Sequence, residues 1–239
     1  MPDLSRRILT PELMDRDDVP PAQLADALAF IRWVNRRLRG SDAVLTHLRQ
    51  WAHAWPSTHD QPITILDLAT GSADIPIAIA QWAQSTGHHV HITGLDRHAA
   101  TLALAQRHLD QHPAARGRIR LVRGDALRPP FASDSFDYVI ASLFLHHLSD
   151  IEVLTALRIM DRLARRGIIW NDLLRHHRAY WWIKLLTLRS SPMIRHDARV
   201  SVLAGFRRAE VLDFRDRLDL HHTSFHRHFA HRFTLAGQR

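Results

Sequence analysis

Hydrophobic and polar positions follow a helical spacing in the amino-terminal part of the chain. Apolar side chains recur every three or four residues over 20–39 and again over 42–55, which predicts two amphipathic helices. Gly40 lies between these segments and is expected to end the first helix. We expect residues 1–58 to form an N-terminal helical cap or lid, joined to the rest by the polar stretch 56–62.

From Ile63 onward, continuous apolar runs alternate with amphipathic segments. The pattern predicts helices over 75–84, 99–112 and 149–166, the last opening with a capping box of Ser149 and Glu152. Between them, strands are expected at 63–68, 89–96, 118–125, 136–143 and 167–172. This alternation predicts βαβ units in an α/β fold, a doubly wound, Rossmann-like and mostly parallel sheet with helices on both faces.

The periodicity changes in the carboxyl-terminal third of the chain. Residues 173–199 are expected to form a helical insertion followed by a turn at Ser190–Pro192, and residues 200–214 a short helix. Two final strands, near 217–223 and 225–236, are joined by a turn that allows only antiparallel pairing. We assign all of 59–239 to the α/β domain.

Composition limits the chemistry. The chain has no Cys, which excludes a catalytic thiol and Cys-ligated metals, and its Lys and Arg exceed Asp and Glu by 32 − 24 = +8. The arginines are scattered, which indicates solvated helix faces more than a nucleic-acid site. Of the 19 His, five crowd irregularly into 221–231; we expect a strand pair there and no metal. No apolar run approaches the ~18 residues of a spanning helix, so we expect a cytoplasmic protein without transmembrane segments.

One predicted strand-to-helix turn carries acids where nucleotide-binding turns carry glycines. In ITILDLATGSADIP (63–76), Gly71 is the only glycine, whereas a dinucleotide turn needs G-x-G-x-x-G to bring backbone amides to a pyrophosphate. Asp67 and Asp74 flank Gly71 and would repel a phosphate. The turn therefore favours a ligand with positive charge and no phosphate, such as S-adenosylmethionine, which has a sulfonium and an ammonium group.

Two further acids end the next two predicted strands. Asp96 lies 96 − 71 = 25 residues after Gly71, close to the spacing of a carboxylate that binds a ribose diol. Asp125 ends the third strand, where it could meet the adenine amino group. Each acid alone could be an ordinary loop aspartate. Three of them at successive strand ends favour one adenosine-containing ligand.

These motifs resemble those of class I S-adenosylmethionine-dependent methyltransferases over roughly residues 60–172. DLATGSAD resembles the variant D-x-A-T-G-T-G-D motif of ubiquinone/menaquinone C-methyltransferases, and GDALRPPFASDSFDYVIASLFLHHL resembles the family's later G-D-A to L-H-H stretch. The resemblance implies a seven-stranded sheet, S-adenosyl-L-methionine as cofactor and S-adenosyl-L-homocysteine as product. The cofactor-binding residues that it implies are Asp67, Ala69, Thr70, Gly71, Asp74, Asp96, Arg97, Asp125, Ala126, Ser142 and Leu143.

Four flanking segments are similar to a bacterial branch that methylates small aromatic or polyketide-derived phenols: ELMDRDDV, VNRRLRG, WNDLLRHH and RHDARVSVLAGF. Together with the resemblance to quinone methyltransferases, this implies a small aromatic or apolar acceptor (a phenol, a quinone or a polyketide product of secondary metabolism), methylated on oxygen or carbon. We expect a monomer or homodimer. Arg36 is a candidate partner for the methionine carboxylate. The aromatic stretch 179–188 is either core or part of an acceptor pocket.

Two histidines follow the fourth predicted strand, beside the expected position of the transferred methyl group. His147 is the candidate general base or acceptor-orienting group and His146 the second candidate, because imidazole transfers protons near neutral pH. Both could instead only hydrogen-bond locally or contact the cofactor.

Two other function classes stay open. The positive charge would suit an RNA methyltransferase, although the sequence ASLFLHH stands where adenine N6 enzymes have D/N-P-P-Y/F. The third possibility is a non-catalytic subunit that uses the cofactor fold as a binding scaffold.

Overall fold

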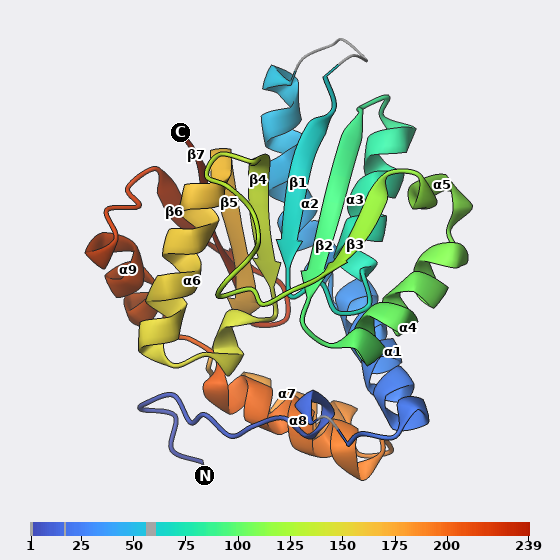
Figure 1. Cartoon of the computed structure of the whole chain (residues 1–239). Helices are drawn as coiled ribbons and strands as arrows, with labels where there is room; N and C mark the ends of the chain where they lie inside the picture. Colours follow the sequence, from blue (N-terminus) through green and yellow to red (C-terminus); the bar gives the residue numbers. More distant parts are fainter. Residues whose placement is uncertain (1, 17, 56–60) are drawn as a thin grey trace.

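The computed structural model describes residues 2–16, 18–55 and 61–239, which form a seven-stranded sheet with helices on both faces (Figure 1). The strand order is β3-β2-β1-β4-β5-β7-β6. The first five strands are parallel, and β7 is antiparallel to both β5 and β6. The predicted doubly wound, mostly parallel sheet with an antiparallel last strand is confirmed.

The elements have the following bounds. The strands are β1 (Ile63–Leu68), β2 (Val90–Asp96), β3 (Ile119–Arg123), β4 (Phe136–Ser142), β5 (Ala164–Leu173), β6 (Thr223–His228) and β7 (Arg232–Gln238). The helices are α1 (Pro21–Arg37), α2 (Gly40–Trp51), α3 (Asp74–Ser85), α4 (Ala99–Asp110), α5 (Pro113–Arg116), α6 (Asp150–Leu163), α7 (His177–Leu186), α8 (Pro192–Ala204) and α9 (Arg208–Arg217). Short 3-10 turns are η1 (Leu13–Asp15), η2 (Ala52–Ala54) and η3 (Leu145–His147).

The central strands are apolar on both faces because helices cover both. One core lies under α2 and α3 and contains Leu48, Ile79 and Tyr138. The other lies under α6 and α9 and is built around Trp170 and Phe214. Helix α6 begins at the predicted capping box, in which the Ser149 hydroxyl accepts from the Glu152 amide and the Glu152 carboxylate accepts from the Ser149 amide.

Gly40 does not end the first helix, as the sequence suggested, but begins α2. Arg39, in the left-handed region at φ 58°, makes the break between α1 and α2. The reason for a glycine at position 40 is a close approach: a Cβ there would lie 2.4 Å from Asn35 Oδ1 and 2.9 Å from Arg232 Cζ. The small residue is required by packing against a strand almost two hundred positions away.

Three other boundaries differ from the sequence prediction. Strand β5 begins at Ala164, inside the predicted helix 149–166, because Ala164 pairs with Phe136 of β4. The helix expected over 200–214 is interrupted at Gly205 and Phe206, where Phe206 forms an isolated bridge with Leu174. The last two strands start later than predicted, at Thr223 and Arg232, because α9 continues to Arg217.

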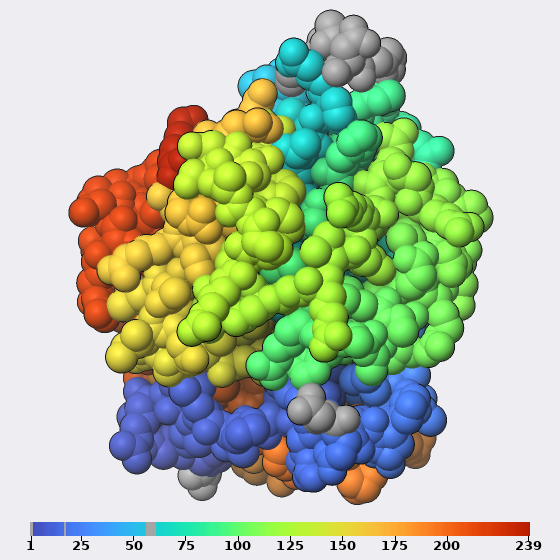
Figure 2. Space-filling model, viewed as in Figure 1, coloured from blue at the N-terminus to red at the C-terminus, as the bar shows by residue number. Residues whose placement is uncertain are grey.

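The carboxyl edge of the parallel strands is covered by α7, α8 and the amino-terminal segment (Figure 1). In the space-filling view the amino-terminal part of the chain, in blue, lies at the bottom of the molecule, and orange atoms of the α7–α8 region are visible between and below it (Figure 2). The proposed domain boundary at residues 58 and 59 lies outside the described residues, as does most of the connector 56–62. Within the described ranges, no helix is both long and apolar enough to span a bilayer.

Candidate active site

The turn between β1 and α3 is built from alternating left-handed residues. Ala69, Gly71 and Ala73 have φ values of 56°, 55° and 57°. Such a conformation costs a non-glycine residue about 1–2 kcal/mol, so two alanines here are held under strain. Strain of this kind concentrates at functional sites. Ala73, which replaces a glycine of the resembled motif, adopts the glycine-like conformation nevertheless.

Two buried acids lie against this turn. Asp67, at the end of β1, accepts a 2.6 Å hydrogen bond from the Thr70 hydroxyl. Burial, reinforced by the charges of Asp74 and Asp96, raises the pKa of Asp67 to about 7. Burial also raises the pKa of Asp96 against the hydrogen bonds from the His98 and Gly71 amides, each 3.0 Å long. A nearby cation would relieve the cost of ionising both acids.

At the end of β4, polar side chains continue along the same sheet edge. The Ser142 hydroxyl accepts a 2.8 Å hydrogen bond from Asn171 Nδ2 of β5. Leu143 follows in the left-handed region at φ 53°, and its amide donates to the Asn171 carbonyl over 2.9 Å. On the far side of the turn, Asn35 of α1 donates to Asp74 over 2.8 Å. Helix α1 is thereby tied to the acid-rich turn.

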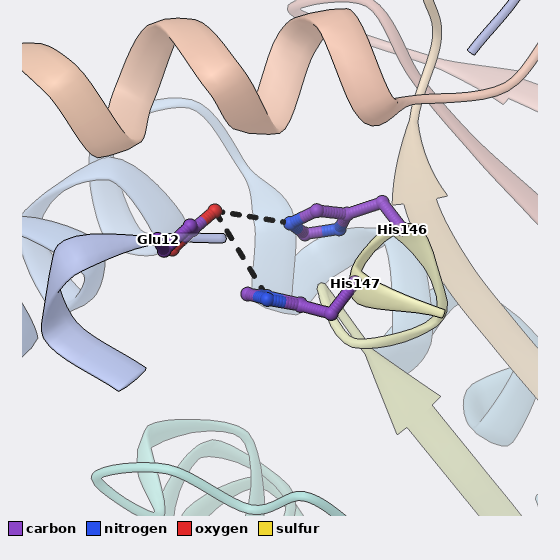
Figure 3. A group of neighbouring side chains, drawn as sticks. All are labelled: Glu12, His146 and His147. Atoms are coloured by element: carbon purple, nitrogen blue, oxygen red, sulfur yellow. Dashed lines mark ion pairs between the residues drawn. The ribbon is translucent and has the colours of Figure 1, made fainter. Parts of the chain in front are cut away.

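His146 and His147 lie against Glu12 of the amino-terminal segment, and we call these three residues the histidine group (Figure 3). The buried Glu12 carboxylate lies 3.5 Å from His146 Nε2 and 3.9 Å from His147 Nε2. The opposite ring nitrogens also face acids: His146 Nδ1 lies 2.7 Å from Asp172 Oδ1, and His147 Nδ1 lies 3.0 Å from Asp15 Oδ2.

These contacts set the charge of His146. Burial opposes its protonation, but Asp172 and Glu12 outweigh burial and raise the pKa of His146 to about 10. The histidines in turn overcome burial and lower the pKa of Glu12. His146 is therefore an imidazolium at neutral pH, held between two carboxylates, whereas the side chain of His147 is 25% exposed.

The amino-terminal segment that carries Glu12 is fastened to its surroundings. Arg7 donates to the carbonyls of His146 and Leu148 over 3.1 Å and 2.8 Å. The Asp197 carboxylate of α8 accepts from the amides of Leu13 and Met14, and the Ser201 hydroxyl bonds to Glu12. We call residues 3–16 the amino-terminal strap.

A mostly apolar pocket of about 630 Å³ adjoins the histidine group, and Glu12 and Leu143 line it. Its walls come from α1, α7, α8 and the β6–β7 hairpin. Trp182, Leu186 and Phe229 also line it and are exposed, so the pocket opens to solvent beside them. The stretch 179–188 thus contributes to a pocket wall, one of the two alternatives left open by the sequence.

Comparisons with known proteins agree with this geometry. Residues 65–167 match a family described as a methyltransferase domain. The part of the chain that runs from β1 into β5 and includes the acid-rich turn therefore has the sequence of a methyltransferase domain.

This methyltransferase domain is similar to quinone-modifying enzymes. It is 34% identical over 104 residues to a demethylmenaquinone methyltransferase of Bacillus licheniformis, covering 44% of this chain and 41% of that protein. A 2-phytyl-1,4-naphtoquinone methyltransferase of Thermosynechococcus vestitus is 36% identical over 107 residues, covering 45% and 44%. The matches therefore span less than half of the length of these relatives.

Solved structures share the fold of the methyltransferase domain over most of the chain. A magnesium protoporphyrin IX methyltransferase of Synechocystis with bound S-adenosylhomocysteine superposes with a TM-score of 0.60 at 16% identity, covering 91% of this chain and 97% of that one. A SAM-dependent methyltransferase of Aquifex aeolicus gives a TM-score of 0.61 at 12% identity, covering 92% and 99%.

The methyltransferase domain brings together most of the residues predicted for the cofactor. Asp67, Thr70, Gly71, Asp74 and Asp96 form one connected group at the first turn, flanked by Ala69, with Ser142 and Leu143 nearby at the end of β4. Arg97 and Asp125 are exposed at the neighbouring strand ends, and Ala126 is buried in the core. Arg36 is exposed on α1 and lines a different pocket, together with Asp74. Their individual contacts with cofactor stay predictions.

Four residues of the site were not singled out from the sequence: Glu12, Asp15, Asp172 and Ser201. Each lies in one of the four segments that resemble the phenol-methylating branch. Those segments are far apart in the chain, and the fold places them around one site. Their convergence was the signal that could have identified these residues.

The Glu12, His146 and His147 ligand atoms lie within 4.8 Å of one another, a geometry that could hold a metal ion. Yet both ring nitrogens of His146 already face carboxylates, which satisfies the imidazolium without a metal. We therefore expect that incubation with EDTA leaves the thermal midpoint of unfolding unchanged within about 1 °C. Differential scanning fluorimetry would check this, with metal analysis of the purified protein as the control. A midpoint that falls on chelation and recovers with Zn²⁺ would show a metal site instead.

Proposed function

We propose that this protein is an S-adenosylmethionine-dependent methyltransferase that acts on a small aromatic acceptor, a phenol, quinone or polyketide-derived compound, at oxygen or carbon. The observation that carries the proposal is the junction of two sites at Leu143. Leu143 follows β4 and lines the apolar pocket, as does Glu12 of the histidine group, and the acid-rich turn follows the neighbouring strand β1. The names of the quinone methyltransferase relatives support this class of acceptor.

The acid-rich turn fits the cofactor that the methyltransferase domain requires. When bound, S-adenosylmethionine supplies an electrophilic methyl group on a sulfonium centre. Asp96 would accept the ribose hydroxyls, because each carboxylate oxygen has a second lone pair besides the one used by a backbone amide. Asp67 and Asp74 provide negative charge toward the methionine end, which suits the sulfonium and the ammonium.

His147 has the surroundings of a general base. Burial raises the pKa of Asp15, but hydrogen bonding to His147 outweighs it and lowers that pKa, so Asp15 is an anion that accepts the Nδ1 proton. The Nε2 atom, 3.9 Å from Glu12 Oε1, would then take a proton from an acceptor hydroxyl, as in a base held by an orienting carboxylate. The imidazolium of His146, which lies between Asp172 and Glu12, would hold the Glu12 carboxylate in place at the pocket wall.

Replacement of His147 by alanine is expected to lower turnover about 100- to 10,000-fold, the usual contribution of a general base. Affinity for S-adenosylhomocysteine should change less than about twofold, because the ion pairs of His147 within the described residues are with Glu12 and Asp15, outside the acid-rich turn. Steady-state kinetics on an identified acceptor and calorimetry with S-adenosylhomocysteine would measure the two effects. His53→Ala, at an exposed histidine of η2, is the matched control. Wild-type turnover in His147→Ala would remove the base assignment.

The proposed function is tested by incubating the protein with S-adenosylmethionine and a panel of phenols, quinones and aromatic polyketides, then detecting methylated products by mass spectrometry. Product formation from one class identifies the acceptor. Stimulation by RNA with a steep dependence on salt would favour an RNA methyltransferase. No calorimetric binding of S-adenosylhomocysteine would leave only a scaffold role.

A further inference from the structure

Arg232 is a fully buried cation at the start of β7, with 1% of its surface exposed. Its Nη2 donates a 2.8 Å hydrogen bond to Asn35 Oδ1. Its Nη1 has no hydrogen-bond partner among the described residues. Burial lowers the pKa of Arg232 to about 10, and the charges of Asp172 and Asp74 oppose that effect, so the guanidinium is charged at neutral pH.

A buried guanidinium without a paired carboxylate is an unfavourable arrangement. Removing an ion from water is compensated only when the ion is paired and its hydrogen bonds are completed. Within residues 2–16, 18–55 and 61–239, no carboxylate lies within 4.0 Å of the Arg232 guanidinium. The other buried arginine, Arg175, has the Glu210 carboxylate as its partner. Arg232 therefore differs from Arg175 in having no carboxylate partner for its buried charge.

The fold makes room for this charge beside the proposed acceptor pocket. Arg232 lines the pocket together with Leu143 and Arg227. On the other side, the absence of a side chain at Gly40 admits the guanidinium, since a Cβ there would lie 3.0 Å from Nη1. Asn35 then links Arg232 to Asp74 of the acid-rich turn by two hydrogen bonds. The guanidinium lies between the turn and the pocket.

A second buried polar atom lacks a partner on the neighbouring strand. Asn171 Oδ1 of β5 has no hydrogen-bond partner among the described residues, and Asn171 is fully buried. In the register of β5 and β7, Leu173 pairs with Arg232 and Asn171 with Thr234, so Asn171 and Arg232 share one face of the sheet. Arg232 Nη1 is a buried donor without an acceptor, and Asn171 Oδ1 is a buried acceptor without a donor. Two such atoms on one face of the sheet indicate a place where a ligand completes the hydrogen bonds.

We propose that Arg232 binds the carboxylate of a ligand at this site. The inference rests on the proposed function, which supplies two sources of that group: the methionine carboxylate of the cofactor, or a carboxylate on the aromatic acceptor. Guanidinium is the side chain best suited to such a group, because its N–H donors match carboxylate oxygens. In the second case the acceptor is a hydroxylated aromatic acid.

The test compares two matched pairs of probes by calorimetry. The first pair is S-adenosylhomocysteine and its decarboxylated analogue. The second is 2,6-dihydroxybenzoate and resorcinol, titrated into protein saturated with S-adenosylhomocysteine. Wild type should bind the carboxylate member of at least one pair about 10- to 100-fold more tightly, as expected for hydrogen bonds to a charged group. The pair that shows the preference identifies the source.

Arg232→Met and Arg232→Gln should remove that preference and leave the affinity for the neutral member of the pair unchanged. Arg227→Met, at an exposed arginine of the same pocket, should keep it. The proposal is overturned if wild type prefers neither acid, a comparison that needs no variant, or if both Arg232 variants fold and retain the preference. If wild type does not bind S-adenosylhomocysteine at all, the proposed function itself fails.

Discussion

Replacement of Asp96 by alanine is expected to abolish measurable binding of S-adenosylhomocysteine while the protein stays folded. Asp96 is 8% exposed at the end of β2, and we propose that its carboxylate accepts both ribose hydroxyls. Losing hydrogen bonds to a charged acceptor in a buried site costs a ligand about 1.5–3 kcal/mol each. We therefore expect affinity to fall by at least about 100-fold, as measured by calorimetry.

Asp96 also holds the turn through the Gly71 amide, so loss of affinity alone does not show direct contact. The 2′-deoxyribose analogue of S-adenosylhomocysteine separates the two roles. Wild type should prefer the ribose form, and Asp96→Ala should bind the two forms equally weakly. Asp125→Ala, at the exposed acid after β3, is the matched control and should keep the ribose preference. Unchanged affinity in Asp96→Ala would overturn the ribose assignment.

Replacement of Asp172 by asparagine is expected to lower the free energy of unfolding by about 3–5 kcal/mol at pH 7, the usual consequence of breaking a buried ion pair. Asp172 is fully buried and accepts from His146, from the Trp170 indole and from the Leu173 amide. Urea unfolding would measure the loss. Asp150→Asn is the control: its pair with Arg7 is 67% exposed on the acid side, so it should lose less than about 1 kcal/mol.

The loss should depend on pH in a defined direction. The pKa of His146 is raised from 6.5 to about 10 in the folded protein, so the stability that its charge contributes is complete below pH 6.5 and disappears as the pH rises toward 10. The difference between wild type and Asp172→Asn should therefore shrink between pH 7 and pH 10. A difference that stays constant over this range would show that His146 is neutral in the fold.

The order of strands and helices could be predicted from the sequence. Buried parallel strands are continuous apolar runs, whereas the covering helices have an apolar residue every three or four positions. Most of the wrong boundaries depend on distant residues, although the late start of the last two strands follows from the length of the neighbouring helix α9. Gly40 resembled a helix stop because the side chain that it accommodates belongs to Arg232. The residues that begin β5 resembled a helix end, yet the Arg165 and Arg166 guanidinium groups pair with Asp137 of β4.

The same distinction applies to the site. Asp67, Gly71, Asp96 and the two histidines lie in local motifs at strand ends, where topology alone brings them to one edge. Glu12 and Asp172 surround His146 from segments 160 positions apart in the chain, and the charge of His146 follows from both. No local pattern contains that information. Arg232 lies outside every recognised motif, and only its burial and its incomplete hydrogen bonding single it out.

The amino-terminal strap has a practical consequence for anyone who expresses shortened forms of this protein. It consists almost wholly of irregular backbone, and a protein engineer would select such a stretch for trimming. Removing it would expose the imidazolium of His146 on one side, free the Asp197 carboxylate and leave His147 without its orienting acid. A form that starts at α1 would retain the sheet and the acid-rich turn. If that form were inactive in an assay, the result would not exclude the compound tested as the acceptor of the full-length protein.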